Sequence, residues 1–187
     1  METNEKLHKL HEETPGWRSR WKDYFFNPSE LDLNDDQRSI LKDRLFESFD
    51  RGYMFKSPEI TVYHAHIDML EDIYAPEIIR DLRKITQGWG FSIGYGDLPK
   101  HTDSQRVSAL MIPLSNEDNV PLDYYNYDND AIIENLYYEY KTWIIRTKSY
   151  HAINQRTVNP RIMLTGSIMH ESFDDLYYAY REGKLFK

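Results

Sequence analysis

The chain has 187 residues, a length typical of one domain with a full hydrophobic core. It contains no cysteine, which excludes disulfides, zinc–thiolate sites, iron–sulfur clusters and thiol nucleophiles. Its 23 basic and 31 acidic side chains give a formal net charge of −8, which argues against nucleic acid as a partner.

The amino-terminal residues 1–6 are polar and charged and lack an apolar h-region, so we expect no secretory signal. No apolar run approaches the length of a membrane span. We therefore expect a cytoplasmic protein without a membrane partner. The stretch 17–22 is the richest in basic residues, and its interleaved tryptophans favour an amphipathic segment docked by their rings.

The amino-terminal part, about 1–88, is predicted to be mainly helical. Asn34 is a candidate N-cap for a helix that ends near Gly52. A strand is predicted over 60–66, and a second helical stretch runs from 70 to Gly88. The apolar face of the first helix is predicted to comprise Ile40, Leu41, Leu45, Phe46 and Phe49.

From Trp89 onward, short β-rich runs alternate with Gly, Pro, Asn and Asp. Many short strands with turn signals indicate a sandwich or a barrel. A closing helix is predicted over about 172–183, with Ser172 as its N-cap. We therefore predict a single domain, 1–187, with a β-rich core over about 89–170 and helices packed outside it. The predicted runs are 89–95, 106–114, 122–127, 138–146, 150–154 and 161–169.

His101 and Asp103 form a His-x-Asp pair at the margin of a predicted strand. Residues i and i+2 of a strand project to the same face, which brings an imidazole nitrogen and a carboxylate oxygen to the spacing that one metal ion needs. Such a pair is common by accident, and alone it also fits a surface histidine beside a turn aspartate.

Two further residues support a metal site. His151 lies far enough beyond Asp103 for several strands to bring it back to the pair, and Arg161 follows ten residues later. We expect His151 and Arg161 on neighbouring antiparallel strands joined by the turn over 154–160, with both side chains facing one cavity. Two histidines and one carboxylate on one face of an octahedral Fe(II) ion leave positions open for a cosubstrate and O₂.

An inward arginine needs an anionic partner, because a buried unpaired charge is very costly. A dicarboxylate such as 2-oxoglutarate supplies one: its distal carboxylate pairs with a guanidinium group, and its 2-oxo acid end chelates iron. The sequence therefore predicts iron ligands at His101, Asp103 and His151, with a 2-oxoglutarate anchor at Arg161.

A second cluster competes for the metal. His64, His66 and Asp68 alternate along a predicted strand and could share one face. Asp68, however, precedes Glu71 by three residues, the pattern of a helix N-cap with its capping partner. No arginine stands ten residues beyond a plausible partner in this second cluster, whereas Arg161 stands ten residues beyond His151. The first cluster is therefore preferred.

At these residues the chain resembles the Fe(II)/2-oxoglutarate-dependent oxygenases, in their prolyl-hydroxylase-like and aspartyl/asparaginyl-hydroxylase-like branches. The matching stretches are HTDSQRVSALMIPLS, 101–115, and SYHAINQRTVNPRIMLTGSI, 149–168. The resemblance implies a double-stranded β-helix (jelly-roll, cupin-like) core with iron at its open end. By position it implies the iron ligands and the 2-oxoglutarate anchor named above.

The resemblance is incomplete at one position. Many relatives carry Ser or Thr two residues after the anchoring arginine, where this chain has Met163. Tyr95, from another strand, is a candidate for the missing hydrogen bond to 2-oxoglutarate. Thr165 is a poorer candidate, because it lies about 13 Å along the strand from Arg161.

Two more residues are candidates for substrate binding. Arg106 either lies near the site mouth, where it binds a substrate carboxylate or helps to bind the cosubstrate, or is a solvated arginine at a strand end. Trp89 either lines a substrate pocket or belongs to the core.

The resemblance implies a dioxygenase that hydroxylates a C–H bond of an amino acid, a peptide side chain or a small metabolite and releases succinate and CO₂. The carboxylate of Asp103 favours hydroxylation, since Gly or Ala there would suggest halogenation. The alternative is a cupin-like domain that binds a metal or ligand without catalysis. A nucleobase demethylase is disfavoured by the net charge of −8 and the missing basic stripe.

Overall fold

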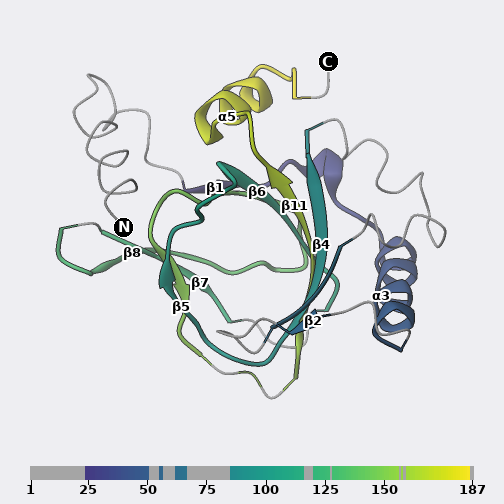
Figure 1. Cartoon of the computed structure of the whole chain (residues 1–187). Helices are drawn as coiled ribbons and strands as arrows, with labels where there is room; N and C mark the ends of the chain where they lie inside the picture. The colour runs from purple at the N-terminus through teal and green to yellow at the C-terminus, as the bar shows by residue number, and fades with distance from the viewer. Residues whose placement is uncertain are drawn as a thin grey trace.

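The computed structural model describes residues 24–50, 55–56, 62–66, 85–115, 120–126, 128–155, 157 and 159–185. The segment 17–22 and residues 70–84 of the second predicted helix lie outside these ranges. Within them, two β-sheets curve around a common interior, with one helix beside the larger sheet and one at the end of the molecule (Figure 1).

The two sheets contain antiparallel strand pairs only, within the described residues. The larger sheet has the order β1-β9-β6-β11-β4-β3-β2, and the smaller one the order β5-β10-β7-β8. In the larger sheet the bounds are β1 Phe25–Phe26, β2 Phe55–Lys56, β3 Val62–His66, β4 Gly88–Gly94, β6 Ser108–Pro113, β9 Trp143–Arg146 and β11 Arg161–Ile168. In the smaller sheet they are β5 Leu98–His101, β7 Leu122–Tyr125, β8 Ile132–Leu136 and β10 His151–Ile153.

The β-rich core is confirmed: five strands lie inside the predicted runs, β4 begins one residue before its run, and β3 lies inside the predicted strand 60–66. The sequence does not predict β5 and β8, because most of their side chains are exposed or half-buried and they lack an apolar pattern. Only the second half of the run 138–146 is a strand, since 139–140 form a turn. The short strands β1 and β2 also depart from the mainly helical character predicted for 1–88.

Helix α3, Asp35–Asp50, begins at the predicted cap. The backbone N–H of Gln37 donates to Asn34 Oδ1 at 2.9 Å, and the N–H of Asn34 donates to Gln37 Oε1 at 3.0 Å. This reciprocal pair is a capping box, which satisfies two N–H groups that the helix itself leaves without partners.

The buried face of α3 differs from the predicted one. Arg38, Leu41 and Leu45 are almost fully buried, at the spacing of one helical face. Ile40 and Phe46 are 43 % and 41 % exposed, so their predicted inward position is wrong. Arg38 can be buried on this face because its Nη1 donates to the Pro113 carbonyl and the Tyr140 ring lies against its guanidinium group.

Helix α5, Phe173–Arg181, confirms the predicted closing helix. Ser172 Oγ accepts a hydrogen bond from the Asp175 N–H at 3.1 Å, as expected of an N-cap. Phe173 and Leu176 are buried in the main core. No helix within the described residues is long and apolar enough to cross a membrane.

The two faces of the larger sheet have different roles. On β11, Ile162, Leu164 and Ile168 belong to the main core, which also contains buried residues of α3 and α5. The alternate β11 residues line a cavity in the interior. A second, smaller cluster joins Tyr124 and Leu136 of the smaller sheet to Ala109 and Ile145 of the larger one. The helices therefore cover the outside of the β core, as predicted, and the interior is left partly open.

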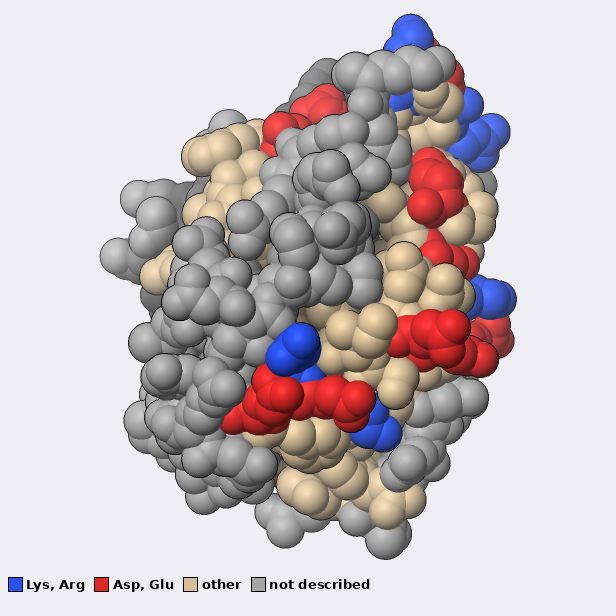
Figure 2. All heavy atoms as spheres, turned by 90° about the vertical axis from the view of Figure 1, so that its right-hand side faces the viewer, with Lys and Arg blue, Asp and Glu red and all other residues tan. Residues whose placement is uncertain are grey.

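Figure 2 shows the face that lies on the right of Figure 1. Acidic and basic side chains of the described residues are interspersed there, and no continuous basic stripe crosses this described part of the face. Because a nucleic-acid backbone binds along such a stripe, the described part of this face offers no binding surface for it.

The turn between β8 and β9 carries local backbone strain. The Lys141 N–H donates to the Tyr138 carbonyl at 2.9 Å, and the two central residues, Glu139 and Tyr140, have φ of 47° and 57°. A tight hairpin turn of this kind favours Gly or Asn at both central positions. Each left-handed residue with a β-carbon costs about 1–2 kcal/mol, so the sequence accepts a penalty at this turn.

Replacing Glu139 with glycine should relieve part of that strain. We expect Glu139→Gly to raise the free energy of unfolding by about 0.5–1 kcal/mol, because relief of strain exceeds the greater entropy of glycine in the unfolded chain. Urea unfolding measures the effect. Glu139→Ala is the control, since it also removes the carboxylate but keeps the β-carbon; equal stability of the two variants would contradict the prediction.

Candidate metal centre

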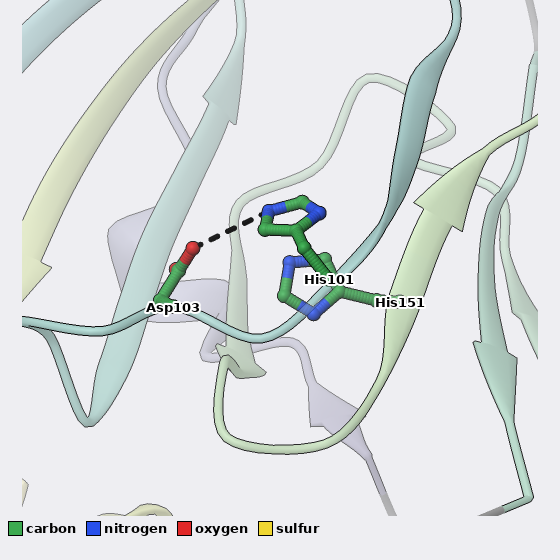
Figure 3. A group of neighbouring side chains, drawn as sticks. All are labelled: His101, Asp103 and His151. Carbon is green, nitrogen blue, oxygen red and sulfur yellow. Dashed lines mark ion pairs between the residues drawn. The ribbon is translucent and has the colours of Figure 1, made fainter. Parts of the chain in front are cut away.

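The two histidines of the predicted site are cross-strand neighbours in the smaller sheet. His101 ends β5, His151 begins β10, and the two residues are directly opposite each other in the register. Opposite residues of an antiparallel pair project from the same face of the sheet. Their ring centroids are 4.4 Å apart, and Figure 3 shows the rings one beside the other.

Asp103 lies beyond the end of β5, so the prediction that it shares a strand with His101 is wrong. A hydrogen bond from its N–H to the Thr147 carbonyl at 2.9 Å holds the loop, and Lys148 Nζ donates to the Asp103 carbonyl at 2.7 Å. The loop still directs the carboxylate toward His101, with 3.4 Å between Oδ1 and Nε2 (Figure 3). One ligand atom from each of the three residues lies within 4.8 Å of the others.

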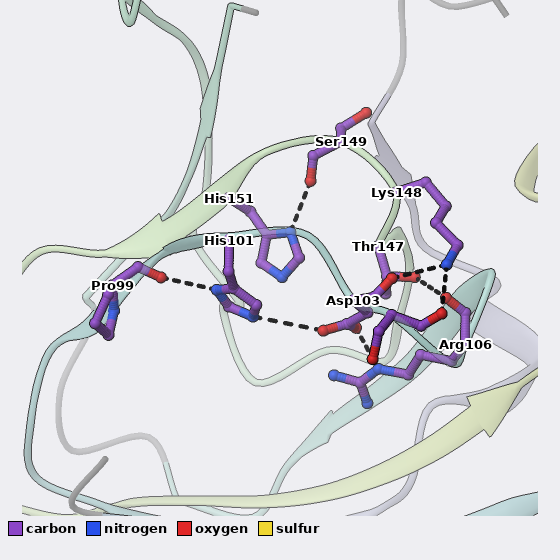
Figure 4. A network of polar contacts seen from close by, with 9 residues as sticks. Pro99, His101, Asp103, Arg106, Thr147, Lys148, Ser149 and His151 are labelled. Carbon is purple, nitrogen blue, oxygen red and sulfur yellow. Dashed lines mark hydrogen bonds and ion pairs between the residues drawn. The ribbon is translucent and has the colours of Figure 1, made fainter. Parts of the chain in front are cut away.

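Backbone carbonyl groups select the tautomer of each histidine. His101 Nδ1 lies 2.8 Å from the Pro99 carbonyl oxygen, and His151 Nδ1 lies 2.8 Å from the Ser149 carbonyl oxygen (Figure 4). A carbonyl can only accept, so Nδ1 carries the proton in both rings. In the neutral ring, Nε2 then has a free lone pair, which is the form that binds a metal.

The electrostatics of the three groups are strongly coupled. Burial would raise the pKa of Asp103, but the hydrogen bond to His101 and the positive charge of Arg106 outweigh it and hold this pKa well below its ordinary value. The hydrogen bond to Asp103 raises the pKa of His101. Burial lowers the pKa of His151 to about 4, so its ring is neutral near pH 7.

These donors fit a divalent metal ion. Two neutral imidazole nitrogens and one carboxylate oxygen form the ligand set of the facial Fe(II) site. Arg106 Nε donates to Oδ2 of Asp103, which leaves Oδ1 to face the histidines. When His101 is protonated, its Nε2–H donates to this oxygen, so the proton and a metal ion would compete for the same position.

A cavity of about 470 Å³ opens beside these residues, within the usual range for small-molecule sites. His101, Asp103 and Arg106 line it, whereas His151 is only 2 % exposed and is not among the lining residues. The opposite wall is formed by alternate residues of β11 and β4, paired as Arg161 with Gly94, Met163 with Ser92, Thr165 with Gly90 and Ser167 with Gly88.

Arg161 reaches the cavity by a different route from the predicted one. Strands β10 and β11 belong to different sheets, so the prediction that His151 and Arg161 lie on neighbouring strands is wrong. The chain therefore passes from the smaller sheet to the larger one between β10 and β11. Arg161 therefore faces the cavity from the opposite wall, with Nη2 donating to the Gly96 carbonyl.

The remaining predicted binding residues differ in whether they line the cavity. Thr165 lines the cavity, and Trp89 borders it while belonging mainly to the core. Tyr95 does not line it: this residue follows β4 at an odd position, whereas the cavity face carries the even ones, and it is 43 % exposed. Arg106 is not a solvated strand-end residue, because it forms an ion pair with Asp103 and lines the cavity.

Among the cavity residues with hydroxyl groups, the sequence analysis missed Ser92, Ser115, Tyr138 and Tyr140. Ser92 lies opposite Met163 in the register, and Tyr138 enters from the strained turn. The alternation Gly88-x-Gly90-x-Ser92-x-Gly94 is a signal for the open wall, since one face of β4 has almost no side chains. No comparable signal marks Tyr138, which lies among several tyrosines.

The competing cluster is only partly within the described residues. The backbone of His64 and His66 lies in β3, beside β4. Their side chains, and the whole of Asp68, lie outside the described residues.

Comparison with solved structures identifies the fold. A Pseudomonas putida prolyl-4-hydroxylase matches with a TM-score of 0.55 at 11 % identity, covering 81 % of this chain and 95 % of that one. A Trichoplax adhaerens prolyl hydroxylase, solved with a peptide fragment of the hypoxia inducible factor oxygen degradation domain, matches with a TM-score of 0.57 at 12 % identity, covering 94 % of both chains. The α-ketoglutarate-dependent epimerase SnoN from nogalamycin biosynthesis matches with a TM-score of 0.57 at 11 % identity, covering 88 % of this chain and 82 % of that one.

The chain thus has the double-stranded β-helix fold of the 2-oxoglutarate- and Fe(II)-dependent oxygenases, as predicted. No family model and no curated protein sequence matches the chain. At these identities the likeness establishes the fold, and the chemistry has to be argued from the residues.

The neutral, buried His151 predicts how the metal-free protein responds to acid. Its folded pKa of about 4 lies below the value of about 6.5 in the unfolded chain, so its stability contribution is complete above pH 6.5 and is lost as the pH falls toward 4. We expect a loss of roughly 3 kcal/mol at most over this window. His101 does not oppose the trend there, because a raised folded pKa leaves it protonated in both states below pH 6.5.

Urea unfolding in the presence of a chelator, at intervals from pH 6.5 to 4, measures this slope. His151→Asn should flatten it, whereas His170→Asn, at an exposed histidine, should leave it unchanged. An equal slope in the His151 variant and the wild type would refute the assignment.

Proposed function

We propose that the chain is an Fe(II)- and 2-oxoglutarate-dependent dioxygenase that hydroxylates a C–H bond of an amino acid, a peptide side chain or a small metabolite. One observation carries the proposal: the three ligand atoms of His101, Asp103 and His151 converge at the edge of a cavity whose far wall presents Arg161. The fold shared with oxygenases of this cofactor type supports it.

In this proposal the two histidines bind iron through Nε2 and Asp103 binds it through Oδ1. Each group is oriented by a hydrogen bond of its own: the Pro99 and Ser149 carbonyls fix the rings, and Arg106 holds the second carboxylate oxygen. A carboxylate held at one oxygen acts as a single ligand, so three coordination positions stay open.

Arg161 binds the distal carboxylate of 2-oxoglutarate. Its contact with the Gly96 carbonyl sets the guanidinium group at the cavity wall. Ser92 and Tyr138 are candidates to replace the hydroxyl that Met163 lacks. Ser92 is the cross-strand neighbour of Met163. Burial raises the pKa of Tyr138 against the opposing charge of Arg161, so the Tyr138 hydroxyl stays protonated and can donate a hydrogen bond. Thr165 remains a further candidate on the same wall.

Bound iron would supply the activation of O₂, driven by oxidative decarboxylation of 2-oxoglutarate. The overall reaction balances as R–H + O₂ + 2-oxoglutarate giving R–OH + succinate + CO₂. One oxygen atom enters succinate and the other enters the product hydroxyl. The mainly apolar remainder of the cavity wall, which includes Met111 and Met163, keeps bulk water from the reacting C–H bond.

The proposal is tested by 2-oxoglutarate turnover. Anaerobically purified protein loaded with Fe(II) should convert 2-oxoglutarate to succinate on admission of air, even slowly and without substrate. Mn(II) should bind in place of iron, and His101→Ala should weaken that binding at least a hundredfold, because two ligands do not hold the ion.

His66→Ala is the matched control and should bind Mn(II) like the wild type; the opposite result would transfer the metal to the cluster around His66. Metal binding without 2-oxoglutarate binding or succinate would instead indicate a cupin-like binding domain.

The role of Arg161 is tested separately from that of the metal. Arg161→Gln should weaken binding of 2-oxoglutarate to the Mn(II)-loaded protein about 10- to 100-fold, as expected for loss of a charge-assisted bidentate pair. Affinity for Mn(II) alone should change less than threefold. Calorimetry measures both, and an equal loss of the two affinities would mean that Arg161 only supports the fold.

A further inference from the structure

Arg106 uses only part of its hydrogen-bonding capacity on Asp103. Its Nε donates to Oδ2 of Asp103, and its backbone carbonyl accepts from Thr147 Oγ1 at 2.9 Å. The two Nη groups lie on the side of the guanidinium away from Asp103 (Figure 4). Neither forms a hydrogen bond within the described part of the chain, and the residue lines the cavity with 26 % of its side chain exposed.

The charges around the cavity do not cancel. Asp103, Arg106, Arg161 and Glu139 are its charged lining residues within the described ranges, besides His101. Glu139 is exposed and its carboxylate contacts Lys141 Nζ at 2.9 Å, which leaves two guanidinium groups against one carboxylate, a charge of +1. A divalent metal adds two positive charges and the 2-oxoglutarate dianion removes them, so +1 remains.

Arg106 already pairs with Asp103 through Nε, and its two Nη groups leave it able to bind a further anion. Arg161 is assigned to 2-oxoglutarate on the wall formed by β11, whereas Arg106 lies beside the metal ligand Asp103 on the opposite side. An anion bound at the Nη groups of Arg106 would therefore come from a second ligand. Guanidinium Nη groups match the two oxygens of a carboxylate.

The geometry points to a substrate that carries a carboxylate, bound by the Nη groups of Arg106 so that an apolar part of the same molecule lies at the metal. This inference rests on the proposed oxygenase function and names its substrate class. The apolar neighbours of the site, among them Met111 and Ile153, suit the body of such a molecule. The carboxylate belongs either to a free small acid or to an acidic side chain of a peptide.

The test compares acids with their uncharged amides. Propionate, 3-phenylpropionate and N-acetylglycine are each paired with the primary amide, and acetyl-Gly-Glu-Gly-amide is paired with its Gln counterpart. Calorimetry is performed on protein saturated with Mn(II) and 2-oxoglutarate. We expect at least one acid to bind tenfold or more tightly than its amide. A preference among the small acids identifies a free acid as the source, and a preference confined to the peptide identifies a side-chain carboxylate.

Two variants separate anion binding from support of Asp103. Arg106→Gln should abolish the preference for acids, and Arg106→Lys, which keeps a positive charge without the fork, should retain it at several-fold lower strength. No preference in the wild type, persistence of the preference in Arg106→Gln, or its equal loss in both variants together with weaker Mn(II) binding would overturn the inference.

Failure of the proposed function has a different signature. In that case the wild type would not bind 2-oxoglutarate in the presence of Mn(II), before any acid is added. A wild type that forms this complex and then fails to distinguish acids from amides overturns the substrate assignment alone.

Discussion

The alternation of side chains across β4 and β11 governs the arrangement of the rest of the molecule. Each strand presents large apolar residues to the helices on one face and a different set to the interior on the other. On β4 the interior set is Gly88, Gly90, Ser92 and Gly94, which leaves space, and on β11 it includes Arg161 and Met163. Because the main core lies outside the larger sheet, the interior can remain partly open without loss of the hydrophobic burial that stabilises the fold.

The smaller sheet contributes the chemistry. Its central strand β10 places His151 between His101 on β5 and Tyr124 on β7, so the buried ring is enclosed by neighbours on both sides. Asp103 lies in a loop, whose backbone is less restrained than that of a strand. Its backbone is tied to Thr147 and its side chain to Arg106, and these contacts supply the rigidity that a ligand position needs.

Strain is concentrated at the turn that carries Tyr138 into the cavity. Two consecutive residues with left-handed backbone raise the free energy of the folded state. Tertiary contacts hold them there: Tyr140 packs on the buried guanidinium of Arg38, and Tyr138 lies near the charges of Arg161 and Arg106. The turn thus contacts helix α3 through Tyr140 and lines the cavity with Tyr138. Its residues Tyr138, Glu139 and Tyr140 belong to the cavity lining, so the turn helps to shape the substrate cavity.

The sequence by itself determined the local features: the caps at Asn34 and Ser172, six strands of the core, and the His-x-Asp pair with a distant histidine and arginine. These depend on spacing along the chain, which the period of a strand or helix translates directly into a face. Tertiary structure alone decided that β10 and β11 belong to different sheets, that Tyr95 lies outside the cavity, and that Tyr138 lines it. Strand partners and contacts such as Arg106 with Asp103 depend on how all the faces pack together, so no local pattern specifies them.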